Sequence, residues 1–151
     1  MNDSGEQASS PACTELESLV MDWLGKMIGL PEDFLHTRSD SLGGGVIQTT
    51  ASEATFVAIL AGRTEAIRTY NQQYPELEDA EINSRLVGYC SDQAHSSVEK
   101  AGLIGLVKLR YIETDDQLSM RGDRLVEAIA KDRERGLIPF FVIPFIIHLN
   151  P

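Results

Sequence analysis

LVGYCSDQAHSSVEKAG, residues 86–102, joins an apolar β-prone run to a polar corner and then to a short helical pattern. Leu86 to Cys90 form the run, and Val98 and Ala101 have the spacing of a helix face. His95 is therefore expected where a strand ends and a helix begins. Ligands bind at such corners in open α/β sheets, although a histidine there can equally well be part of a capped turn.

The same alternation of strand and helix continues after this corner. Leu106–Ile112 and Ile138–Ile143 read as strands, and Asp123–Arg135 reads as an amphipathic helix between them. Its inward residues are expected to be Leu125, Val126, Ile129 and Ala130. Strands that alternate with helices predict an α/β fold with a mostly parallel, helix-covered sheet.

Two longer helices are predicted before the corner. Ser10-Pro11 resembles a helix start, and Gly29 ends that helix. Its apolar stripe is expected to pack in the core and consists of Leu16, Leu19, Val20, Trp23, Leu24, Met27 and Ile28. The second helix starts at a capping box, Thr50 to Glu53, and runs to about Tyr74, with a face of small residues suited to packing on a sheet.

The start of the second helix has the features of an anion site. Thr50, Ala51 and Ser52 are small, two of them carry hydroxyls, and the first N–H groups of a helix attract negative charge. The alternative is that the hydroxyls only cap the helix. Gly43-Gly44-Gly45 matches neither a P-loop nor a dinucleotide motif, and a flexible turn is the simpler interpretation.

Composition narrows the possible partners. The net charge is −10 and the pI about 4.6, which argues against nucleic acid. Two cysteines at unrelated positions suggest a reducing compartment, and the absence of a signal pattern or an unbroken apolar span predicts a cytoplasmic chain without a membrane segment. Three functions remain open: a phosphate-bearing cofactor under His95, a binding domain without chemistry, or, least favoured, a metal site of His95, Cys90 and Asp92.

Several motifs carry a resemblance to a known family. They are Ser10–Glu17, Met21–Met27, Gly43–Gln48, Thr50–Ala54 and Ser91–Gly102. Together they resemble the pyridoxal-phosphate-dependent group II amino-acid decarboxylases, from about Ser10 to Val142. Other stretches are most similar to insect histidine decarboxylases and next to aromatic-L-amino-acid (DOPA) decarboxylases; they include Gln48–Thr55, Leu60–Thr64 and Asp79–Asn83.

The resemblance implies a role for each matching residue. Thr50, Ala51 and Ser52 would hold the phosphate of pyridoxal 5'-phosphate, and His95 would stack on its ring as a catalytic residue. The substrate would be an amino acid, histidine or alternatively an aromatic one, and the full-length protein a homodimer. Because the related insect aldehyde synthases carry Asn at this position, His95 favours simple decarboxylation.

The resemblance also implies a partial domain. We expect a disordered leader over 1–9, part of the large domain of a fold-type I enzyme over 10–142, and a divergent tail over 143–151. The Schiff-base lysine and the aspartate that pairs with the pyridine nitrogen have no counterpart in the sequence. The chain is therefore expected to be inactive alone, and a non-catalytic partner of full-length subunits is an alternative function.

Overall fold

The chain forms two compact units, residues 1–49 (unit 1) and 50–151 (unit 2). The computed structural model describes residues 10–37 and 43–144. The leader expected over 1–9 therefore lies outside the described residues, as does most of the expected tail, although Ile143 belongs to a strand. Each unit is described in its own right below.

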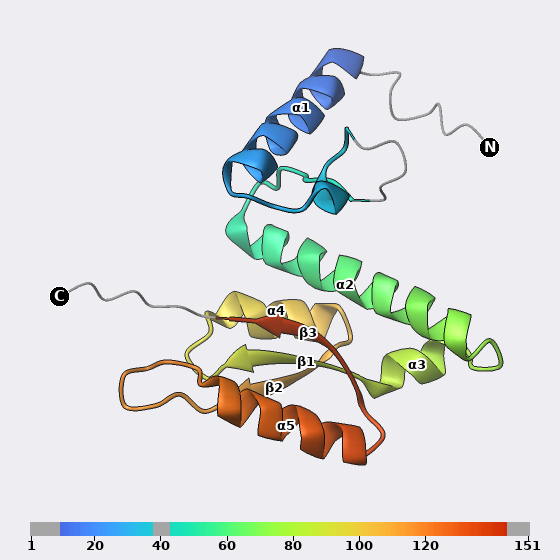
Figure 1. The fold of residues 1–151 in the computed structure, drawn as a ribbon, viewed down its shortest axis with the longest axis vertical. Helices are drawn as coiled ribbons and strands as arrows, with labels where there is room; N and C mark the ends of the chain where they lie inside the picture. Colours follow the sequence, from blue (N-terminus) through green and yellow to red (C-terminus); the bar gives the residue numbers. More distant parts are fainter. Residues whose placement is uncertain (1–9, 38–42, 145–151) are drawn as a thin grey trace. The chain divides into compact units, whose positions relative to one another are not determined.

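Unit 2 is built on three parallel strands in the order β2-β1-β3, as Figure 1 shows. The strands are β1 (Leu86–Ser91), β2 (Lys108–Ile112) and β3 (Ile138–Ile143). This confirms the predicted α/β fold with its parallel sheet. All residues of the central strand β1 are buried, which explains why it reads as a continuous apolar run.

The pairing of β1 with β3 contains one irregularity. Val87 lies opposite Pro139, and the register then shifts so that Gly88 lies opposite Phe141. Proline has no N–H to donate to a neighbouring strand, so strands tolerate it at bulges and edges. Pro139 therefore accounts for the position of the shift.

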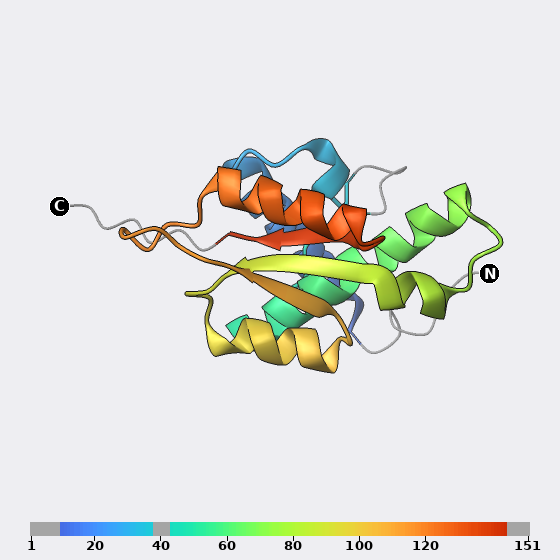
Figure 2. The same ribbon diagram turned by 90° about the horizontal axis from the view of Figure 1, so that it is seen from below.

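Helices cover both faces of the sheet (Figure 2). On one face lie α2 (Ala51–Gln73) and α4 (Ser96–Ile104), with α3 (Asp79–Arg85) at the end of the sheet where β1 begins. On the other face lies α5 (Gly122–Glu134). The buried apolar residues form three clusters: Ile59, Ala101 and Val107; Ile82, Leu86 and Ile138; and Val87, Tyr89 and Ile112.

The inward face of α5 differs from the prediction. Val126 and Ala130 are exposed, while Leu125, Ala128 and Ile129 pack against the sheet. Together with Asp132 the packed residues follow the i, i+3, i+4, i+7 spacing of one helix face. The prediction failed because the last position of that stripe is a carboxylate instead of an apolar residue.

Asp132 is a fully buried charge that joins α5 to two strands. Its side chain accepts a hydrogen bond of 3.0 Å from the Tyr89 hydroxyl and pairs through both oxygens with the Arg110 guanidinium. Burial raises the pKa of Asp132, but the hydrogen bonds from Arg110 and Tyr89 outweigh burial and lower it overall. Burial, assisted by Asp132, raises the pKa of Tyr89 to about 12.

Unit 2 is expected to lose stability in alkaline solution. Burial also raises the pKa of Cys90 to about 11, from an ordinary value of 9.0, while that of Tyr89 rises from 10.0 to about 12. The folded state keeps both protons to a higher pH than the unfolded state does. The contribution of these two groups to the free energy of unfolding is therefore fully present below pH 9 and is lost between about pH 9 and 12. Urea titrations at several pH values measure this loss. Tyr89→Phe should abolish the part of this loss that occurs above pH 10. If the free energy of unfolding of this variant falls as steeply with pH as that of the unmodified chain, Tyr89 is not the group responsible.

On α2 the prediction of a small-residue face was mostly wrong. Ala51, Ala54, Ala58 and Ala61 are exposed. Gly62 does face the sheet, and a Cβ there would lie 2.9 Å from the Phe141 ring. Ile59 next to it is the buried residue of this helix, because a large apolar side chain gains more from burial than alanine does.

Unit 1 consists of α1 (Pro11–Met27), a 3-10 turn (Glu32–Phe34) and a glycine-rich loop. Ser10 precedes Pro11 at the helix start as predicted, and Gly29, at φ 74°, follows the helix end. The expected burial of the apolar stripe is wrong, since every one of its residues is exposed, from 38% at Val20 to 81% at Met27.

The covered face of α1 passes instead through Asp22 and Gly25. The Asp22 carboxylate accepts hydrogen bonds from the backbone N–H groups of His36 (2.7 Å) and Thr37 (2.9 Å). Gly45 lies so close to this helix that a Cβ would come within 2.5 Å of the Met21 methyl carbon. Glycine is therefore needed for close approach, and the interpretation as a flexible turn was wrong here.

Within the described residues, no helix has the length and apolar character needed to cross a bilayer.

Candidate functional site

The N-termini of α2 and α4 lie at the same end of the sheet, where the strands reach their carboxyl ends (Figures 1 and 2). The two helices pack against each other through the cluster of Ile59 and Ala101. The fold thus brings the predicted residues Thr50, Ala51 and Ser52 to the same edge as His95, the edge at which the strands have their carboxyl ends. In parallel α/β sheets this edge is where ligands bind.

Thr50 caps α2 as the sequence predicted. Its side-chain oxygen accepts a hydrogen bond of 3.1 Å from the N–H of Glu53, and its carbonyl accepts one of 3.0 Å from the N–H of Ala54. Ala51 and Ser52 are exposed, and their N–H groups have no acceptor among the residues that the structure describes. Two free donors, an adjacent hydroxyl and the positive end of the helix dipole form an environment suited to an anion.

His95 is the N-cap residue of α4. Its Nδ1 atom accepts a hydrogen bond of 3.1 Å from the backbone N–H of Ser97 and lies 2.9 Å from the Ser97 hydroxyl oxygen. His95 is exposed, so a ligand can reach this residue. The capped turn and the ligand contact, which the sequence left as alternatives, are therefore compatible.

The corner between β1 and α4 is fixed by Ser91. Its carbonyl accepts a hydrogen bond of 3.0 Å from Ala94 N–H, and its buried side-chain oxygen accepts one of 3.0 Å from Gln93 N–H. The two bonds hold the backbone that leads to His95. The position and orientation of the imidazole are therefore set by hydrogen bonds of Ser91, before it in the chain, and of Ser97, after it.

Cys90 and Asp92 occupy different environments from His95. Cys90 is fully buried in β1, and burial raises its pKa to about 11, which disfavours the thiolate that metal binding requires. Asp92 is exposed, and hydrogen bonds from Thr114 lower its pKa despite the opposing effect of desolvation. Among the described residues, no group of three His, Cys, Asp or Glu side chains could hold a metal ion.

Sequence reasoning missed two residues that organise this region. Ser97 contacts the imidazole, and a serine two positions after a histidine at a helix start was an available signal for it. Arg63 of α2 donates a hydrogen bond of 2.5 Å to the carbonyl of Gly105, the C-cap residue of α4. This bond links the two helices that carry the site, and no local sequence pattern indicates it.

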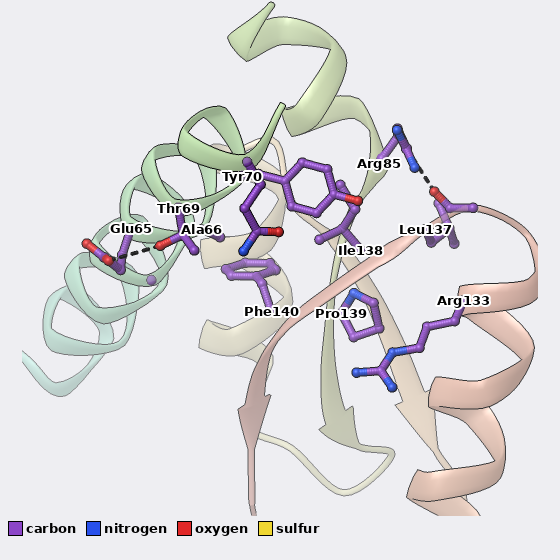
Figure 3. Close-up of a pocket in the computed structure, with 13 residues that line it drawn as sticks. Glu65, Ala66, Thr69, Tyr70, Arg85, Arg133, Leu137, Ile138, Pro139 and Phe140 are labelled. Carbon is purple, nitrogen blue, oxygen red and sulfur yellow. Dashed lines mark hydrogen bonds between the residues drawn. The ribbon is translucent and has the colours of Figure 1, made fainter. Parts of the chain in front are cut away.

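A cavity of about 670 Å³ lies elsewhere in unit 2, between the second half of α2 and the start of β3 (Figure 3). Tyr70 and Phe140 line it, together with Arg85, which donates a hydrogen bond of 2.8 Å to the Gly136 carbonyl. It is found where β3 begins, at the opposite end of the strands from His95. Its position is unlike that of ligand sites in parallel sheets, so we do not assign the chemistry to it.

Comparison with known proteins gives a family match over nearly the whole chain. Residues 4–146 match the family described as the pyridoxal-dependent decarboxylase conserved domain. Among curated proteins, the histidine decarboxylase of Drosophila melanogaster is 69% identical over 135 residues, and the aromatic-L-amino-acid decarboxylase of Manduca sexta is 56% identical over 135 residues. The match covers 89% of this chain in both cases, but 16% and 26% of the two relatives.

A solved structure shows the same fold. The crystal structure of Oryza sativa TDC with PLP and tryptamine superposes with a TM-score of 0.71 at 35% sequence identity. The superposition covers 90% of this chain and 27% of the other.

Proposed function

The chain belongs to the pyridoxal-dependent decarboxylase family, and from this premise we propose that it provides the phosphate-binding and ring-stacking residues of a pyridoxal-phosphate-dependent amino-acid decarboxylase. The observation that carries the proposal is the capped, exposed N-terminus of α2 at the same sheet edge as His95. Bound pyridoxal phosphate supplies an electron sink for the loss of an amino-acid carboxylate as CO2.

The residues present fit the cofactor. The N–H groups of Ala51 and Ser52, with the Ser52 hydroxyl, would donate to the phosphate, and the helix dipole would stabilise its charge. Thr50 would keep these donors in position by capping the helix. The exposed imidazole of His95 would stack on the pyridine ring and exclude water from one of its faces.

For the substrate we propose histidine, with aromatic amino acids as the alternative. The support is the identity to the Drosophila relative, 69% against 56% for the Manduca relative over the same length. We further propose that the full-length protein is a cytoplasmic homodimer. Both cysteines are free, as is usual in a reducing compartment, and homodimerisation follows from the family resemblance.

Of the lysines of unit 2, Lys108 and Lys131 have hydrogen-bond partners and Lys100 is exposed. The Lys108 ammonium donates to the Ser84 carbonyl, the Lys131 ammonium pairs with Glu127 at 2.6 Å, and Lys100 is exposed on α4. None of them has a contact that would hold it beside His95. This supports the proposal that the chain binds the cofactor without turning over an amino acid alone.

Binding of pyridoxine 5'-phosphate tests the phosphate site, because this analogue lacks the aldehyde that would react with surface lysines. The chain should bind it more tightly than pyridoxine, and Ser52→Asp should weaken binding at least about tenfold by placing a carboxylate near the phosphate. Equilibrium dialysis measures both affinities.

Ala80→Asp is the matched control. Ala80 occupies the second position of α3, as Ser52 does in α2, and is likewise exposed. The control should bind like the unmodified chain. Equal affinity for pyridoxine and its phosphate, or equal losses in the two variants, would refute the proposed site.

A further inference from the structure

The hydrogen bonds of His95 constrain the position of its proton. A backbone N–H can only donate, so the 3.1 Å contact from Ser97 N requires Nδ1 to be an acceptor. An acceptor nitrogen carries no proton, and the neutral ring must then carry its proton on Nε2. The N–H of Val98 donates 2.9 Å to the His95 carbonyl, so the first turn of α4 holds this geometry.

The Ser97 hydroxyl adds a second donor to the same atom. Its oxygen lies 2.9 Å from Nδ1, and since Nδ1 has no proton to give, the hydroxyl must donate. The Ser97 side chain is half-buried, which limits its competing contacts with water. Both donors therefore favour one tautomer and one ring orientation.

We infer that Ser97 is a positioning residue that favours, in the neutral imidazole of His95, the tautomer protonated at Nε2. The Nε2–H group is then left as a hydrogen-bond donor for an acceptor group bound at this edge of the sheet. The tautomer is inferred from this chain alone. A hydrogen bond from Nε2–H to a bound cofactor or to a substrate carboxylate rests on the proposed function.

Nitrogen NMR of the imidazole tests the inference without any cofactor. The chain has three histidines, so ¹⁵N-histidine labelling gives few signals, and His95→Gln identifies those of His95. In the folded chain, the fraction of neutral His95 rings that carry the proton on Nε2 should exceed the same fraction in urea. Ser97→Ala keeps the backbone donor but loses the hydroxyl donor, so it should move this fraction measurably toward the unfolded value, and Ser97→Thr should restore it.

Ser96→Ala is the matched control, since it removes the same hydroxyl one position earlier in the helix. Amide spectra of each variant establish that it is folded. A proton on Nδ1 in the folded chain, an unchanged tautomer in Ser97→Ala, or an equal change in Ser96→Ala would overturn the inference.

Affinity for pyridoxine 5'-phosphate separates this inference from the proposed function. If the tautomer behaves as expected but the chain binds no pyridoxine phosphate, the cofactor proposal fails and the role of Ser97 stands. If the chain binds the analogue and the tautomer does not depend on Ser97, the positioning role fails alone.

Discussion

Replacing Asp132 with alanine is expected to lower the free energy of unfolding by about 1–3 kcal/mol. The carboxylate is completely buried and is the common partner of Arg110 in β2 and Tyr89 in β1. Its removal leaves the buried Tyr89 hydroxyl without its acceptor, while the Arg110 guanidinium, whose side chain is 37% exposed, can still be hydrated. Loss of a buried hydrogen-bond acceptor costs more than the bond itself contributes, because the remaining donor has no partner.

Urea unfolding followed by circular dichroism measures this effect. Glu127→Ala is the control, because Glu127 lies on the same helix and pairs with Lys131 while both side chains are exposed, at 65% and 61%. Exposed pairs contribute little, so the control should leave the midpoint nearly unchanged. Similar midpoints for Asp132→Ala and Glu127→Ala would show that Asp132 does not hold α5 to the sheet.

The sheet could be predicted from the sequence because its signals are local. Leu86–Ser91 is buried on both faces and therefore reads as an uninterrupted apolar run, while Ile138–Ile143 matches its predicted bounds. The start of α2 carries a strong capping signal at Thr50, whereas for the corner after β1 a cap at His95 was one of two alternatives. Side-chain partners distant in sequence are different, since Asp132 and Arg110 are 22 residues apart and neither position indicates the other.

Whether the apolar stripe of α1 is buried could not be predicted from the sequence. Trp23 and Met27 have the spacing of a buried face, yet they are 60% and 81% exposed. Periodicity shows that a face is apolar, but not which segment covers it. The face that is covered in unit 1 instead depends on Asp22 and on a glycine at position 45, whose role is visible only once the loop lies against the helix.

Ile59→Ala is expected to lower the free energy of unfolding by about 2–5 kcal/mol and also to weaken binding of pyridoxine 5'-phosphate. Ile59 is 1% exposed and packs with Ala101 of α4 and Val107 before β2. Truncation would leave a cavity between α2 and α4, the two helices whose N-termini form the candidate site. Val126→Ala is the matched control, because it shortens a β-branched residue that is 66% exposed on α5, and it should change stability by less than about 0.5 kcal/mol. Urea unfolding and dialysis report the two effects separately. A destabilised Ile59→Ala chain that is still folded and binds the analogue as tightly as the unmodified chain would show that the site does not depend on the packing between these helices.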